Sequence, residues 1–229
     1  MKNQKVNNFL YFSNDRWLAH RLIRVIEREF NFLWEFIRTK GRFRTALDCG
    51  AHCGVYSYYL AKHFQHVHSF EVEPEVRSIL ADNIRSCGCG NVSVYDCGVG
   101  DVEQIVNILP GWKWNIQNGS LSTVVLPDGM YKSAQIQSRV ATIDSFNFSD
   151  VDLIKIDVEG YENKVVDGAI NTILKYSPII VYEDHPKHPA TRYGDDRSML
   201  DILGGMGYSV AHSLKTRTGR IDYILERRF

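Results

Sequence analysis

The chain has 229 residues, of which 44% are hydrophobic and 12% aromatic, and this composition excludes the disordered and collagen-like classes of protein. Its 27 Lys and Arg residues balance 27 Asp and Glu residues, which argues against nucleic-acid binding by bulk electrostatics alone. The charge is unevenly distributed, because residues 1–45 and 212–229 are basic whereas residues 46–211 carry nine more acidic than basic side chains. We therefore expect an acidic body with basic flanks.

The cysteines and the apolar segments bear on where the protein works. Five cysteines, an odd number, occur in a chain whose first residues lack the apolar run of a signal peptide. Free thiols in a reducing compartment are the simplest interpretation, so we expect a cytoplasmic protein. The sequence has no uninterrupted apolar stretch of about 18 residues, and no membrane span is expected. The spacing of Cys87 and Cys89 is too short for a structural zinc site.

The N-terminal part predicts a helical arm over residues 1–43. Apolar residues recur at helical spacing from residue 15 to residue 40, and Gly41 follows as a stop signal. The face between them is basic and carries Arg16, Arg21, Arg24, Arg28 and Arg38. Two interpretations remain open: a solvated helix face beside a core, or a basic lid that contacts anions.

A single domain over residues 44–229 follows the arm. Buried strands are expected at 45–49, 67–71, 92–97, 151–157 and 178–183, helices at 55–64, 74–87, 162–175 and 197–206, and final strands at 208–212 and 222–226. Residues 101–142 interrupt this alternation and predict an inserted hairpin or a sheet edge. The pattern indicates an α/β fold of the Rossmann-like, doubly wound type with a mostly parallel sheet.

Residues 45–57, TALDCGAHCGVYS, predict a cofactor loop between a strand and a helix. A dinucleotide-binding loop needs G-x-G-x-x-G, whereas this loop lacks one glycine and would place Asp48 beside a pyrophosphate. S-adenosylmethionine fits better, because it carries a sulfonium and an ammonium group and no phosphate. We expect Asp48 to hold its amino acid end directly or through water, within a site lined by Asp48, Gly50, Ala51, His52 and Gly54.

Two further strand ends supply candidate contacts to the same cofactor. Glu71 lies 23 residues after Asp48, where an acidic side chain accepts hydrogen bonds from both ribose hydroxyls. Asp96 and Cys97 end the third strand, and Asp96 is placed to approach the adenine amino group. Plain solvation of a strand end is the alternative for Glu71 and Asp96.

Residues 152–162, DLIKIDVEGYE, predict the chemistry loop. Lys155 and Asp157 share one face of a strand, and a charge in an apolar strand is costly without a partner. Lys155 therefore needs a carboxylate such as Asp157, while the strand end presents Asp157, Glu159 and Glu162 to a cleft. The alternative is a Lys–Asp pair that only holds the sheet edge, with Glu162 capping the next helix.

On these motifs the chain resembles the FkbM family of S-adenosylmethionine-dependent methyltransferases. The resemblance covers residues 44–186 in consistent order and rests on LDCGAHCG (47–54), SFEVEP (69–74), ATIDS (141–145), IKIDVEG (154–160), VVDG (165–168) and IVYEDH (180–185). The family favours Asn where His52 stands, and an F-E-P run where this chain has FEVEP.

The resemblance implies a class I methyltransferase fold, in which a seven-stranded sheet has one antiparallel strand. It also implies methyl transfer to oxygen, commonly a hydroxyl of a sugar, a glycan or a glycosylated small molecule. Asp157, Glu159 and His185 are candidate bases for that hydroxyl, with Lys155 beside them. Alternatively, Asp157, Glu159 and Glu183 hold Mg²⁺, which would acidify the hydroxyl.

Three other functions stay open from the sequence. An RNA 2′-hydroxyl is an alternative acceptor, supported only by the basic arm. An NAD(P)-dependent oxidoreductase uses a similar sheet but is disfavoured by the missing glycine. A non-catalytic adenosine-binding domain would bind the cofactor and transfer no methyl group.

Overall fold

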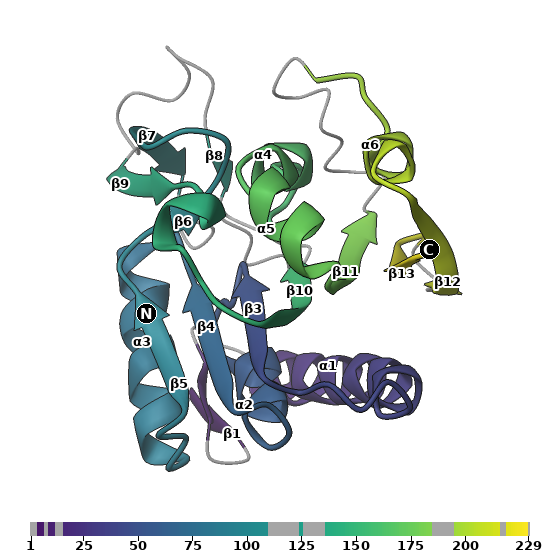
Figure 1. The fold of residues 1–229 in the computed structure, drawn as a ribbon. Coiled ribbons are helices and arrows are strands. Elements are labelled where there is room, and N and C mark those ends of the chain that lie inside the picture. The colour runs from purple at the N-terminus through teal and green to yellow at the C-terminus, as the bar shows by residue number, and fades with distance from the viewer. Residues whose placement is uncertain are drawn as a thin grey trace.

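Seven strands form the main sheet of a computed structural model that describes residues 4–6, 9–11, 16–109, 124–125, 136–184, 195–215 and 219–228. Their order is β12-β13-β11-β10-β3-β4-β5 (Figure 1). The bounds are β3 Thr45–Cys49, β4 His66–Phe70, β5 Val92–Tyr95, β10 Val151–Ile156, β11 Ile179–Asp184, β12 Tyr208–Lys215 and β13 Ile221–Arg227. Neighbours from β5 to β11 pair in parallel, while β13 runs antiparallel to β11 and β12. The mostly parallel sheet with one antiparallel strand is confirmed.

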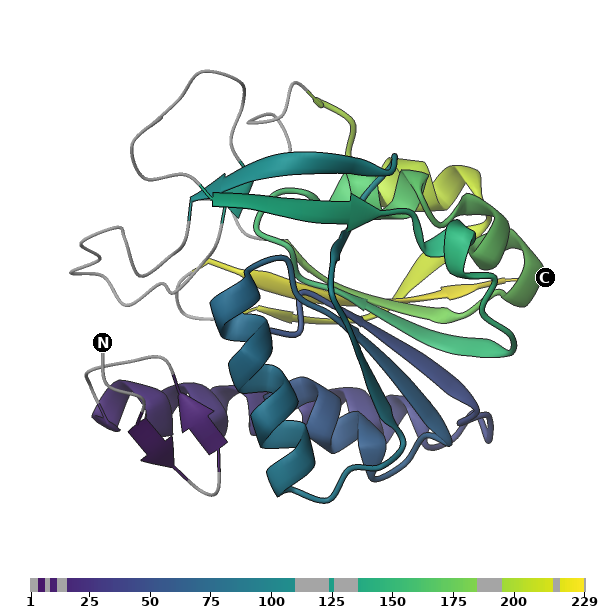
Figure 2. The ribbon, with the colours of Figure 1, turned by 90° about the vertical axis from the view of Figure 1, so that its left-hand side faces the viewer.

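Helices cover both faces of this sheet (Figure 2). One face carries α1 Arg16–Ile37, α2 Val55–Ala61 and α3 Pro74–Ser86, and the other carries α4 Glu162–Asp167, α5 Ile170–Tyr176 and α6 Met199–Gly205. All six residues of β10 are buried, as expected for a central strand covered on both sides. No described helix is long and apolar enough to cross a membrane, and all five cysteines are free thiols.

Helix α1 of the N-terminal arm packs into the core. Phe30, Leu33 and Ile37 are at most 2% exposed and pack in one cluster with Ala46 of β3 and Leu60 of α2. Each such side chain contributes roughly 2 kcal/mol by leaving water. The opposite side of α1 is exposed at Arg24, Arg28 and Arg38. The helix therefore forms part of the layer that covers the sheet, with a basic face turned to solvent.

The insertion forms a second sheet beside the first. It consists of β6 Gly98–Val99, β7 Gln104–Leu109, β8 Val124–Val125 and β9 Ile136–Ala141, in the order β6-β9-β7-β8. Strand β7 pairs antiparallel with both β8 and β9, and β6 pairs in parallel with β9, so the antiparallel pairing predicted for this insertion is part of a four-stranded sheet. A short 3₁₀ helix, Ile143–Phe146, then leads to β10. The strands β1 Gln4–Val6 and β2 Phe9–Tyr11 form a small antiparallel pair that the sequence patterns did not predict.

The helix predicted over 162–175 is divided into α4 and α5. A Cβ atom at Gly168 would lie 1.9 Å from the carbonyl oxygen of Gly100, so the backbone just after β6 and the backbone just after α4 touch here. Helix α5 starts afresh because the carboxylate of Asp144 accepts the N–H groups of Asn171 and Thr172 at 3.0 and 2.9 Å. This close approach docks the second sheet onto the helical layer.

The approach at Gly168 is testable by adding one methyl group. We expect Gly168→Ala to lower the free energy of unfolding by about 3 kcal/mol, because two backbone segments must separate. Gly204→Ala is the matched control, since Gly204 in α6 has nothing within 4 Å of an added Cβ. That variant should change stability by less than about 1 kcal/mol. Urea unfolding of both variants checks this, and equal effects would contradict it.

Candidate active site

The candidate site lies at the carboxyl edge of the main sheet, where the central strands end side by side (Figure 1). Lys155 of β10 lies opposite Asp48 of β3, and Asp157 and Glu183 directly follow the last matched pair of β10 and β11. Side chains at matched positions of neighbouring strands point to the same face. These four charged side chains therefore share the face that α1 and α2 cover.

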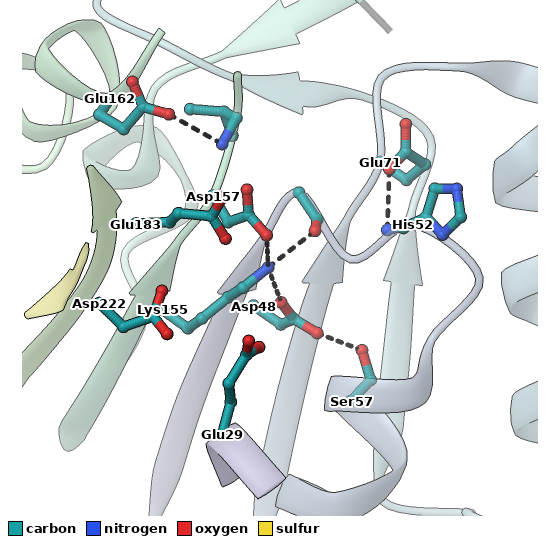
Figure 3. Close-up of polar contacts among 12 residues, drawn as sticks. Glu29, Asp48, His52, Ser57, Glu71, Lys155, Asp157, Glu162, Glu183 and Asp222 are labelled. Carbon is teal, nitrogen blue, oxygen red and sulfur yellow. Dashed lines mark hydrogen bonds and ion pairs between the residues drawn. The ribbon is translucent and has the colours of Figure 1, made fainter. Parts of the chain in front are cut away.

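Lys155 is a nearly buried ammonium group held by three oxygens (Figure 3). Its Nζ donates to the carbonyl oxygen of Gly50 at 2.9 Å and lies 3.3 Å from Asp48 Oδ1 and 3.4 Å from Asp157 Oδ2. Burial by itself would lower the pKa of Lys155, but the charges of Asp157 and Asp48 outweigh burial and raise this pKa. Asp157 is the predicted partner, and Asp48 is a second one. Lys155 thus joins the ends of β3 and β10 to the glycine loop.

Asp48 lies beneath the glycine loop, because its side chain is 0% exposed. Its Oδ2 accepts a hydrogen bond from Ser57 Oγ of α2 at 2.6 Å, and Ser69 Oγ of β4 donates to the same Ser57 oxygen at 2.8 Å. This series of hydrogen bonds links β3, α2 and β4. A fully buried carboxylate reaches a ligand only through its neighbours, which here are Lys155 and Ser57.

The glycine loop directs backbone N–H groups into the protein. Four of them have internal acceptors: Gly50 and Ala51 donate to Phe70 O at 3.0 and 2.9 Å, His52 to Glu71 Oε2 at 2.9 Å, and Gly54 to Ala51 O at 2.8 Å. A phosphate cradle requires N–H groups that point at the ligand. The loop therefore disfavours a pyrophosphate, in agreement with its missing glycine, and suits a ligand without phosphate.

Both glycines of this loop are required by their surroundings. Gly50 has a φ of 83°, and a Cβ there would lie 1.9 Å from the carbonyl oxygen of Asp157. Gly54 has a φ of 86°, and a Cβ there would lie 2.5 Å from Leu80 Cδ1. The loop can pass so close to β10 and α3 only without side chains at these two positions.

Glu71 is buried at the end of β4 and holds the glycine loop (Figure 3). Oε2 accepts the N–H of His52, and Oε1 accepts the N–H of Glu73 at 2.9 Å. Burial raises the pKa of Glu71 to about 7, although these two hydrogen bonds oppose the rise. His52 has a φ of 49°, and burial lowers the pKa of its imidazole to about 4. The side chain of His52 is therefore neutral at physiological pH.

The loop after β10 turns tightly around Glu162. Glu162 Oε1 accepts the N–H groups of Val158 and Gly160 at 3.2 and 3.0 Å, so this carboxylate closes its own loop. Glu159 and Gly160 have φ values of 59° and 101°, in the left-handed region. Asp157 remains the most accessible acid near Lys155, with 35% of its side chain exposed. Glu162 is one of the three acids predicted to reach the cleft, but its carboxylate accepts backbone N–H groups of this loop instead.

An ion-pair network next to Asp157 was missed by the sequence patterns. Arg220, just before β13, pairs with Glu183 of β11, Asp222 of β13 and Glu29 of α1. Figure 3 shows Glu183 beside Asp157, Asp222 near Lys155, and Glu29 on α1. Burial and the charge of Asp157 raise the pKa of Glu183. Only Glu183 stands in a recognisable motif, IVYEDH, and no sequence signal joins it to Glu29 or Arg220.

The remaining predicted residues lie apart from this group or outside the description. Asp96 is a solvent-exposed side chain that pairs with Arg139 at 3.8 Å. Cys97 is fully buried in the main core cluster. His185 lies outside the described residues.

The carboxylates do not match the donor set of a magnesium site. Within the described part of the chain, no three His, Cys, Asp or Glu side chains form a group that could hold a metal ion. Asp157 and Glu183 have the cationic partners Lys155 and Arg220 instead. A cation at this edge would have to displace those partners, so the described residues do not fit Mg²⁺.

Comparison with solved structures shows the fold. An FkbM methyltransferase from Methylobacillus flagellatus superposes with a TM-score of 0.56 at 19% identity, over 81% of this chain and 44% of that one. The chain thus spans less than half the length of that structure. A putative methyltransferase from Escherichia coli gives a TM-score of 0.49 at 14% identity, over 90% of this chain and 87% of that one. No protein of curated function matches the sequence.

Comparison with family models shows the family. The model of the methyltransferase FkbM domain matches residues 48–210, which is more than half of the chain. The matched segment contains the glycine loop, Glu71, the Lys155–Asp157 pair and Glu183. The chain therefore belongs to the FkbM family of S-adenosylmethionine-dependent methyltransferases.

Proposed function

We propose that this protein transfers a methyl group from S-adenosylmethionine to a hydroxyl oxygen of a sugar, a glycan or a glycosylated small molecule. The observation that carries the proposal is the pair of acids, Asp157 and Glu183, at adjacent strand ends in a chain of the FkbM family. Two carboxylates at the ends of adjacent strands can accept hydrogen bonds from neighbouring hydroxyls of one molecule. The free thiols support work in a reducing compartment such as the cytoplasm.

The residues at the sheet edge fit S-adenosylmethionine by their chemistry. A buried carboxylate at the end of β4, Glu71, has acceptor capacity left for ribose hydroxyls after its two backbone hydrogen bonds. The glycine loop keeps four N–H groups internal, which suits a nucleoside without phosphate. In this proposal Asp157 faces the cationic end, Asp48 supports it through Lys155, and Asp96 and Cys97 flank the adenine. The bound cofactor supplies an electrophilic methyl group.

The chain's own residues would orient the acceptor and remove its proton. Displacement at carbon needs the acceptor oxygen held about 3 Å from the methyl group and in line with the sulfur. Asp157 and Glu159 are the candidate acceptors of the hydroxyl proton, with His185 as a third. Lys155, at 3.4 Å from Asp157, fixes that carboxylate by its charge. Proton removal by a positioned base contributes about 10²- to 10⁴-fold to such a rate.

The acidic character of this edge favours a carbohydrate over RNA as the acceptor. Asp157, Glu183 and Asp222 lie close together there, and a polyanion would be repelled by them. Arg24 and Arg28 of α1 are exposed, and Arg28 is near enough to lower the pKa of Asp222. An uncharged polyol meets no such repulsion and can use each carboxylate as an acceptor.

The role of Glu71 is tested by cofactor binding. Glu71→Gln should raise the Kd for S-adenosylmethionine at least about tenfold, because charge-assisted hydrogen bonds to ribose are lost. Glu75→Gln, an exposed position in the first turn of α3, should leave the Kd within twofold. Isothermal titration measures both, with circular dichroism as the check on folding. An unchanged Kd in a folded Glu71→Gln variant would remove Glu71 from the site.

The acceptor class and the roles of Asp157 and Glu159 are tested together by methyl transfer. The protein is incubated with methyl-labelled S-adenosylmethionine and a fractionated cell extract, and we expect label in carbohydrate or glycosylated small molecules. Asp157→Asn and Glu159→Gln should each lower the rate at least about 100-fold, because a base is lost. Asp82→Asn, in an exposed pair on α3, serves as control. Label confined to RNA, or wild-type rates in folded variants, would contradict the proposal.

A further inference from the structure

The guanidinium group of Arg220 faces three carboxylates from three separate elements. Nη1 lies 3.0 Å from Glu183 Oε2 of β11, Nε lies 3.5 Å from Asp222 Oδ1 of β13, and Nη2 pairs with Glu29 Oε1 of α1. All four side chains are less than 20% exposed. A planar guanidinium that contacts acids through all three nitrogens is fixed in orientation. Arg220 therefore fixes the position of the Glu183 carboxylate.

The charges in this network do not balance. One guanidinium serves three carboxylates, and burial makes unbalanced charge costly. Burial, then the charges of Asp157 and Asp222, raise the pKa of Glu183, while the charge of Lys155 opposes that rise. Burial also raises the pKa of Asp222 to about 6. The cluster thus has a tendency to hold a proton, whereas the Arg220 guanidinium, 3.0 Å from Glu183, favours the ionised carboxylate.

The charged groups near Glu183 belong to β10, the loop after β10, β13 and α1. Asp157 and Lys155 belong to β10, Glu159 follows that strand, and Asp222 lies opposite Glu183 on β13. Glu29 of α1 reaches Glu183 through Arg220. Among these groups, Arg220 is the cation in direct contact with Glu183.

The network also joins parts of the chain on both sides of the matched FkbM segment. That segment ends at residue 210 and begins at residue 48, so Glu29 and Arg220 lie outside it, whereas Glu183 lies inside it. Helix α1 and the start of β13 thus reach the same carboxylate from flanking parts of the chain. Residues outside the matched segment therefore determine the surroundings of a strand-end acid within it.

We propose that Arg220, held by Glu29, is a positioning residue that keeps the Glu183 carboxyl group oriented toward the acceptor, beside the candidate base Asp157. This inference rests on the proposed methyl transfer. In the transfer the acceptor O–H bond breaks and its proton passes to Asp157. The O–CH₃ bond forms as the C–S bond breaks, and the electron pair of that bond remains on sulfur. Glu183, beside Asp157, accepts a hydrogen bond from a neighbouring hydroxyl of the acceptor and so orients that molecule.

The proposal predicts a shift in the pH dependence of catalysis. In Arg220→Gln the acidic limb of the kcat profile should move to higher pH by at least about one unit, because the cluster of acids next to the base loses a cation and holds a proton more tightly. At pH 7 the kcat should fall about tenfold, with the Kd for S-adenosylmethionine within twofold of wild type. Arg220→Lys should shift the limb less, because the positive charge remains. Arg38→Gln, which breaks an exposed Arg–Glu pair on α1, is the control and should leave the profile unchanged.

A readout without turnover separates this inference from the proposed function. Carbon-13 NMR of glutamate-labelled protein, with the Glu183 signal assigned from Glu183→Gln, follows the titration of Glu183 directly. We expect its midpoint to rise in Arg220→Gln, and Arg220→Lys carries the same test if the Gln variant unfolds. An unchanged midpoint would overturn the inference whatever the activity. A raised midpoint in a protein whose wild type transfers no methyl group would refute the proposed function alone.

Discussion

The ammonium group of Lys155 lies within 3.4 Å of two carboxylates and donates to the carbonyl oxygen of Gly50, in a part of the fold with little access to water. Removing such a charge from water is unfavourable unless its partners are well placed. Asp48 is the buried partner and Asp157 the accessible one. The loop, the ends of β3 and β10, and the accessible acid are therefore positioned by one cation.

Other features of the site extend from this group of charges. Asp48 also accepts a hydrogen bond from Ser57 and so fixes the position of α2. On the other side of the glycine loop, Glu71 accepts the N–H of His52. Arg220 pairs with Glu183 in the same way as Lys155 pairs with Asp157, so each of these strand-end acids has a cation beside it. Two cation–acid pairs thus lie next to each other at the edge of one sheet.

The sequence predicted those features that depend on local spacing. Strands buried on both faces are near-continuous apolar runs, which is why β3, β10 and β11 were recognisable. Lys155 and Asp157 are two residues apart in a strand, so their shared face and their pairing followed from the geometry of the strand. The absence of a third glycine in the loop agreed with N–H groups that bond internally.

Features that depend on tertiary contact were not predictable. The helix is divided at Gly168, where the backbone of Gly100 approaches so closely that an added Cβ would lie 1.9 Å from its carbonyl oxygen. The two glycines are far apart in the sequence. The exposure of a strand-end acid depends on the elements above it, so Asp48, which is buried, and Asp96, which faces solvent, looked alike in the sequence. Arg220 and Glu29 are separated by most of the chain, and only the packing of α1 joins them.

Lys155 supplies the positive charge that the buried carboxylate of Asp48 requires. Urea unfolding should show that Lys155→Met lowers the free energy of unfolding by about 3 to 5 kcal/mol, because Asp48 is left buried without a counter-charge. The double variant Lys155→Met with Asp48→Asn should recover at least half of that loss, since the amide can still accept from Ser57. A loss below about 1 kcal/mol in the single variant, or no recovery in the double variant, would contradict the account.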